Sequence, residues 1–108
     1  MKNLSLSILS LVLLGSTSVM AAGDPAAGKN AYATCAACHG MNGEGNPTLQ
    51  SPRLAGQYDW YLASSIKKYR DGIRGKDPKD TSGMMMAPMA ANLTDQQIDD
   101  IVAYIGTL

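Results

Sequence analysis

The chain has 108 residues, a length that accommodates one domain. Its nine lysines and arginines balance its nine aspartates and glutamates, so neither a nucleic-acid partner nor a strongly acidic one is expected. With 45% hydrophobic residues, the composition is ordinary for a soluble protein.

The N-terminal segment has the three parts of a secretory signal. Lys2 supplies a positive charge, residues 4–14 are apolar, and small residues lie near the expected cleavage point after Ala21. An uncleaved membrane anchor is the alternative, but a span needs about 20 predominantly apolar residues, and this stretch is shorter and rich in serine. We therefore expect residues 1–21 to be a signal peptide, cleaved on export to the periplasm, and residues 22–108 to form the mature domain.

The first predicted helix begins at Asp24 and Pro25, an N-cap residue followed by proline at the first helical position. It runs through an alanine-rich segment to Ala33 and is expected to stop at the motif in residues 35–39, Cys-Ala-Ala-Cys-His. Residues 40–47 contain three glycines and are predicted to form a loop.

A second helix is predicted over residues 58–71. Apolar residues recur there at the spacing of one helical face: Leu62, Ile66, Tyr69 and Ile73. Glycines after residue 71 end the helix. The polar segment 76–83 and the methionine-rich segment 83–89 are both predicted to form loop.

The last helix is predicted to begin after Thr94, because Thr94 and Gln97 form a capping box and Asp95 suits the positive end of the helix dipole. No segment shows the alternation of a strand, so the predicted fold class is all-α. The expected buried stripe of this helix consists of Ile98, Ile101, Val102 and Ile105.

Cys35, Cys38 and His39 carry the most specific signal, because Cys-x-x-Cys-His is the attachment signature of c-type haem. Both thiols lie on one side of a single turn, and His39 would supply a nitrogen ligand to the iron. A thioredoxin-like pair would need a βαβ pattern, and a structural zinc site would need four ligands, whereas the chain has three Cys and His in total. A plain disulfide leaves His39 unexplained. One haem c per chain, attached through both cysteines, is therefore expected.

The second axial ligand is expected to be a methionine, since the chain has no second histidine and a thioether suits an electron-transfer haem. Met41 is too close to His39 in sequence to reach the opposite haem face. In an extended segment, Met84 and Met86 would face one way and Met85 the other. The candidates are the four methionines of segment 83–89: Met84, Met85, Met86 and Met89.

The order of these features resembles the class I c-type cytochromes, in particular the small bacterial monohaem members and one half of the periplasmic di-haem cytochromes. The resemblance implies the cytochrome c fold, with three to four helices wrapped around one covalently attached haem. The matching segments are 22–25, 35–40, 52–57, 61–62, the methionine segment, 93–95 and 103–105.

The resemblance also implies residue roles. It places the axial methionine at Met86, eight residues before Thr94, and makes the backbone carbonyl of Pro52 the acceptor for the ring N–H of His39. Arg53 would pair with a haem propionate or remain a solvated loop charge. The first and last helices would cross at Gly28, Tyr32, Ile101 and Tyr104.

The function implied is one-electron transport, with a low-spin haem held by His39 and Met86 cycling between Fe(II) and Fe(III). The expected partners are periplasmic or membrane-bound redox proteins, with no small-molecule substrate and no nucleic acid. The alternative is a haem subunit bound tightly to a catalytic partner such as a flavoprotein dehydrogenase. The methionine segment disfavours an open iron site, so an enzyme is not expected. The chain would be a monomer or a weak dimer.

Segment 67–80 is basic but also contains three aspartates. It is interpreted either as a solvated face or as a docking patch for an acidic partner. Its basic residues are Lys67, Lys68, Arg70, Arg74, Lys76 and Lys79.

Overall fold

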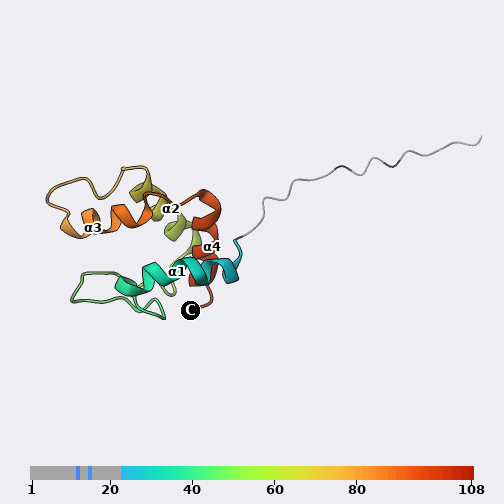
Figure 1. Ribbon diagram of the computed structural model, residues 1–108, viewed down its shortest axis with the longest axis horizontal. Helices are drawn as coiled ribbons and strands as arrows, with labels where there is room; N and C mark the ends of the chain where they lie inside the picture. The colour runs from blue at the N-terminus through green and yellow to red at the C-terminus, as the bar shows by residue number, and fades with distance from the viewer. Residues whose placement is uncertain (1–11, 13–14, 16–22) are drawn as a thin grey trace, which may run out of the picture.

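A computed structural model describes residues 12, 15 and 23–108 of the chain (Figure 1). Over these residues it contains four helices and no strand, with one isolated bridge in the loop after the first helix. The all-α class is therefore confirmed. No helix in this described part is long and apolar enough to cross a membrane. The predicted signal peptide, residues 1–21, lies outside the described residues except at two isolated positions.

Helix α1 (Pro25–His39) begins as predicted, with the side chain of Asp24 accepting a hydrogen bond of 2.9 Å from the N–H of Ala26. The prediction that this helix stops at the Cys motif is wrong, because α1 continues through the motif. Between Gly28 and Gly40 no glycine or proline interrupts the sequence, and alanine favours the helix. Gly40, with a φ of 88°, then ends α1.

Helix α2 (Asp59–Arg70) agrees with the predicted range to within one residue at each end. On its expected apolar face, Leu62 is buried and Ile66 is half-buried against the core. The assignment of Ile73 to that face is wrong. Ile73 lies beyond the end of the helix and is exposed, because the chain turns away at Gly72.

Helix α3 (Thr81–Ala90) replaces the loop predicted for the methionine segment. Asp80 caps this helix by accepting a hydrogen bond of 2.9 Å from the N–H of Gly83, and methionine and alanine are strong helix formers. Pro88 lies in the last turn, where its missing N–H removes one hydrogen bond. The expected alternation of neighbouring methionines in an extended segment is therefore wrong.

Helix α4 (Asp95–Ile105) begins with the predicted capping box. The N–H of Gln97 donates to the Thr94 hydroxyl over 3.1 Å, and the N–H of Thr94 donates to Oε1 of Gln97 over 2.9 Å. The predicted stripe is confirmed, and it supplies the largest fully buried side chains of the core: Ile98, Ile101 and Ile105.

The predicted crossing of α1 and α4 is confirmed. Gly28 is buried there because the backbone carbonyl of Asp100 lies where a side chain would begin. Beside it, the rings of Tyr32 and Tyr104 lie 5.3 Å apart, centroid to centroid. Glycine at this position lets the two backbones approach closely, so the direction of α1 is set by α4.

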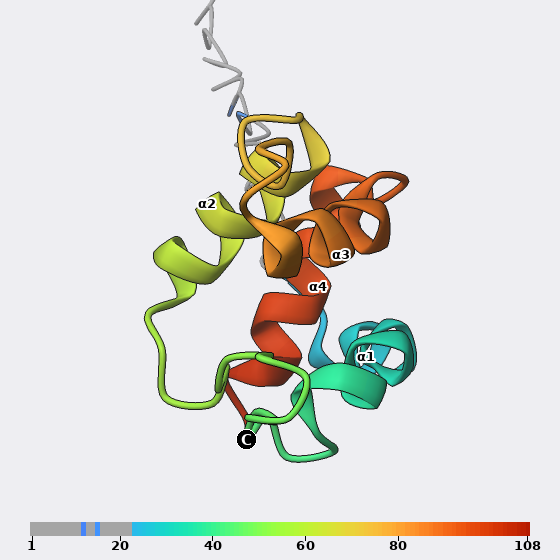
Figure 2. The same ribbon diagram turned by 90° about the vertical axis from the view of Figure 1, so that its left-hand side faces the viewer.

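The four helices form two groups around α4. Helix α1 packs along α4, while α2 packs against both α3 and α4. Helices α1 and α3 share no extensive interface, and both views place them on different sides of the molecule (Figures 1 and 2). The Cys motif and the methionine segment thus lie on two separate helices, α1 and α3, which form two walls of the fold.

Candidate functional site

The two cysteines lie in the last turns of α1, where residues three apart share a helical face. Cys35 and Cys38 are half-buried and both thiols are free. Cys35 packs against the hydrophobic core, and this burial raises the pKa of its thiol. The pair therefore presents two reduced thiols on one side of a single helix.

His39 is the last residue of α1, and its side chain is buried. Its Nδ1 lies 2.8 Å from the backbone carbonyl oxygen of Pro52. Because a carbonyl oxygen can only accept, Nδ1 carries the proton and donates this hydrogen bond. In the neutral imidazole the other ring nitrogen, Nε2, then keeps its lone pair and can coordinate a metal.

The loop after α1 brings Pro52 back to His39. The N–H of Gly45 donates to the carbonyl of His39 over 2.7 Å, and the N–H of Leu54 donates to the carbonyl of Gly43 over 2.8 Å. Gly45 has a φ of 83°, and a side chain there would collide with the backbone of Pro52 and Arg53. Because Gly45 has no side chain, the part of the loop that contains Pro52 and Arg53 can lie against the part that directly follows α1.

The four candidate methionines differ in exposure. Met84, Met85 and Met89 are 46%, 63% and 54% exposed, whereas Met86 is half-buried. On a helix Met86 shares a face with Gly83 and Ala90, and both of these residues are buried. Among the four, Met86 therefore belongs to the inward face of α3.

A side-chain contact joins the two walls of the fold. The hydroxyl of Ser82, at the start of α3, donates to Oε1 of Gln50 over 2.8 Å. Gln50 lies in the loop that follows the Cys motif and has a φ of 55°, which is unusual for a residue other than glycine. The sequence carries no motif for this contact, because the two residues are far apart along the chain.

Arg53 and the basic segment make contacts within the protein. The Nε of Arg53 donates to the carbonyl of Ala55 over 3.0 Å, and the residue is exposed. Arg70 bonds to Asp71 and Asp95, and the guanidinium of Arg74 lies 4.4 Å from the ring centroid of Tyr69. Arg70 and Arg74, two of the basic residues of this segment, thus make contacts within the protein. The mixed charges of the segment did not indicate these contacts.

The donors present fit a covalently attached haem. Two free thiols share one helix face, one imidazole keeps a nitrogen lone pair, and thioethers line a separate helix. Within the described residues, no three Cys, His, Asp or Glu side chains converge as a closed metal site would require.

The chain matches a protein-family model over most of its length. Residues 25–108 match the family model described as Cytochrome c. The match begins at the first residue of α1 and includes all four helices.

The chain is similar to a protein of about its own length and to a protein about twice as long. It is 49% identical over 86 residues to cytochrome c-554(548) of Halomonas halodenitrificans, a match that covers 80% of this chain and 98% of that protein. It is 34% identical over 101 residues to the "Thiosulfate dehydrogenase electron acceptor" of Thiomonas intermedia, covering 94% of this chain and 43% of that one.

A solved structure is similar as well, that of reduced recombinant cytochrome c4 from Pseudomonas stutzeri. The TM-score is 0.62 at 30% identity, and the match covers 81% of this chain and 50% of that chain. The chain thus spans nearly the whole of one relative and about half the length of the other two.

Proposed function

Because the chain belongs to the cytochrome c family, we propose that it is a one-electron carrier whose haem, attached through Cys35 and Cys38, is held between His39 and Met86. When bound, the haem iron supplies reversible one-electron chemistry. The contribution of the chain is to anchor the haem, to provide two ligands and to limit access to the iron.

One hydrogen bond supports the proximal ligand most directly. The Pro52 carbonyl accepts a hydrogen bond from the Nδ1–H of His39, which favours the neutral tautomer that leaves Nε2 free. The carbonyl also fixes the direction of the ring, and a buried ring has few other orientations. Both features support His39 as the axial ligand.

Two observations support Met86 as the distal ligand. It is the least exposed of the four α3 methionines, and it lies on the same helical face as the buried Ala90. Met85 and Met89 share a different face, which is exposed. Met84 borders a surface groove between α2 and α3.

Two protein ligands would leave no open coordination position, so the chain is proposed to transform no substrate and not to be an enzyme. Its partners would be periplasmic or membrane-bound redox proteins. Arg53 is proposed to pair with a haem propionate through the guanidinium nitrogens that do not bond to Ala55. Residues 1–21 are proposed as the cleaved export signal, which the mass of the mature protein tests.

A tightly bound haem subunit is the second candidate, because one relative is named as the electron acceptor of a dehydrogenase. Size-exclusion chromatography of a native extract separates the two possibilities. A diffusible carrier elutes at the size of the chain or of a weak dimer, whereas a subunit elutes with its catalytic partner.

Visible spectroscopy of matched variants tests the ligand assignment. Met86→Ala should abolish the methionine–iron charge-transfer band of the oxidised protein, because the thioether is removed. Met85→Ala, the control on the exposed face, should leave the band unchanged. Survival of the band in Met86→Ala, with its loss in Met89→Ala, would contradict the assignment.

A further inference from the structure

The helix that carries Met86 is attached to the rest of the protein at both ends and near its middle. At its N-terminus the carboxylate of Asp80 caps the first turn. Near its middle, Gly75 lies so close to the carbonyl of Gly83 and the side chain of Ala87 that no other residue would fit. Its C-terminus leads within a few residues to Leu93 and the capping box of α4.

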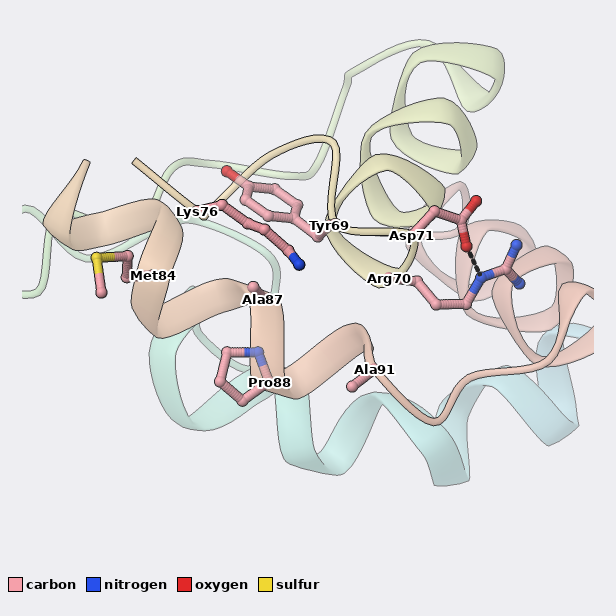
Figure 3. Close-up of a pocket in the computed structure, with 10 residues that line it drawn as sticks. Tyr69, Arg70, Asp71, Lys76, Met84, Ala87, Pro88 and Ala91 are labelled. Carbon is pink, nitrogen blue, oxygen red and sulfur yellow. Dashed lines mark hydrogen bonds and ion pairs between the residues drawn. The ribbon is translucent and has the colours of Figure 1, made fainter. Parts of the chain in front are cut away.

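Beside the end of α2, one side of α3 is open to solvent. An open groove of about 380 Å³ separates the end of α2 from α3. Figure 3 shows Met84, Ala87, Pro88 and Ala91 along the α3 side of the groove, opposite Tyr69 and Lys76. None of the α3 residues belongs to the hydrophobic core cluster of the described chain.

Arg70, the last residue of α2, reaches from this groove to the turn between α3 and α4. Its Nη1 donates to the backbone carbonyl of Leu93 over 3.3 Å and to Oδ1 of Asp95 over 2.6 Å. Its Nε donates to Oδ1 of Asp71 over 2.9 Å. One guanidinium thus joins the end of α2 to the turn that follows the methionine helix.

We propose that Arg70 is a positioning residue for the axial methionine. By holding the Leu93 carbonyl and Asp95 against the end of α2, it fixes the turn from which α3 extends back over the fold. It thereby sets how firmly the thioether of Met86 is held at the iron. This inference rests on the proposed function, because it takes Met86 as the ligand.

The hydrogen bonds that Arg70 makes with Asp95 and with Leu93 differ in how strongly they hold the turn. Its side chain is only 21% exposed, whereas that of Asp95 is 71% exposed, so the ion pair with Asp95 is screened by solvent. The bond to the Leu93 carbonyl is partly buried and satisfies a backbone acceptor in the turn. Removing Arg70 should therefore matter more than removing the carboxylate of Asp95.

Imidazole competition in the haem-loaded protein tests the inference. The readout is the imidazole concentration that displaces the methionine, followed by loss of the methionine–iron charge-transfer band while the far-UV circular dichroism stays native. In Arg70→Gln, that concentration should fall about tenfold, the factor expected for one charge-assisted hydrogen bond. Arg70→Lys, which can keep one donor, should lie between Arg70→Gln and the unmodified protein.

Arg74→Gln is the matched control, because Arg74 lies four residues away and contacts Tyr69 instead of the turn. It should change the displacing concentration by less than about twofold, as expected for an exposed charge. An unchanged value in Arg70→Gln, or an equal fall in both variants, overturns the inference. Should Arg70→Gln fail to fold, Asp95→Asn must lower the concentration by about threefold, and no change there overturns the inference equally.

The ligand assignment can fail separately. If Met86→Ala keeps the charge-transfer band, the proposed ligand is wrong, whatever Arg70→Gln does. If Met86→Ala loses the band and Arg70→Gln competes with imidazole as the unmodified protein does, only the role of Arg70 is wrong.

Discussion

The helices that carry the two candidate axial ligands are held in opposite ways. Helix α1 crosses α4 with backbone against backbone at Gly28, and its motif end packs into the core through Cys35. Helix α3 borders an open groove and contributes no residue to the hydrophobic core cluster of the described chain. The histidine side is therefore built as part of the core, while the methionine side is attached to it. In such a fold the methionine is the ligand expected to yield first.

Removing the haem should have the largest effect, because it takes away the group that both walls would share. We expect the mature Cys35→Ala/Cys38→Ala protein to lose most of its helical far-UV circular dichroism. Only eight hydrophobic residues of the described chain are buried, and a core this small rarely sustains a fold. Met86→Ala, which keeps both attachment bonds, is the control and should stay helical. A native helical spectrum for the double cysteine variant would contradict the expectation.

A substitution in the crossing of α1 and α4 should have the next largest effect. Gly28→Ala places a methyl group against the backbone of Asp100, so we expect the free energy of unfolding to fall by about 3 kcal/mol. Denaturant unfolding of the haem-loaded protein measures the change. Ala33→Ser, at an exposed position of the same helix, should cost less than about 0.5 kcal/mol. Equal losses in the two variants would show that the crossing is not tightly packed.

Hydrogen exchange compares the two walls without any substitution. In the haem-loaded protein, amides of α3 should exchange at least about tenfold faster than those of α4, because loosely packed elements open locally at lower free energy. Mass spectrometry with peptide-level resolution measures both helices in one experiment. Equal protection of α3 and α4 would mean that the end contacts of α3 are as effective as core packing.

The smallest effect concerns acid stability at the start of α1. Asp100 accepts hydrogen bonds from the N–H of Asp24 over 2.8 Å and from Nε2 of Gln96 over 2.9 Å, and the first of these lowers the pKa of its carboxyl below the ordinary value of 3.8. The ionised carboxylate therefore stabilises the fold above pH 3.8, and this contribution is lost as the pH falls through the lower folded-state pKa.

We expect Asp100→Asn to lower the thermal midpoint slightly at neutral pH and to reduce its decline in acid. Thermal unfolding followed as a function of pH measures both changes. Asp99→Asn removes one negative charge from the same helix and serves as the control. Midpoint curves for Asp100→Asn and the unmodified protein that run parallel into acid would contradict the expectation.

Local signals predicted the fold where one short segment contained both the start and the pattern of a helix. The capping box at Thr94 and the apolar stripe behind it placed α4 correctly. The sequence does not predict α3, because its consecutive methionines are apolar on every side and show no helical period. The Cys motif does not mark the end of α1, because Gly40 is the residue that ends the helix.

The sequence also indicated the chemistry of the site, because that signal too lies in one short segment. Cys35, Cys38 and His39 are neighbours along the chain, so their spacing alone indicates what they bind. The contacts of Gln50 with Ser82 and of Arg70 with Leu93 join residues 32 and 23 positions apart. Only the fold brings such residues together, and none of them belongs to a motif.

The crossing of α1 with α4 also has a consequence for the order of synthesis. The first helix of the domain finds its packing partner in the last one, and a hydrogen bond joins Asp24 to Asp100, 76 residues later. The domain cannot close until α4 has been made, because these long-range contacts wait for the end of the chain. Until that moment the turn that bears Cys35 and Cys38 has no finished core beside it. The topology thus makes the core beside both thiols depend on the last helix of the domain.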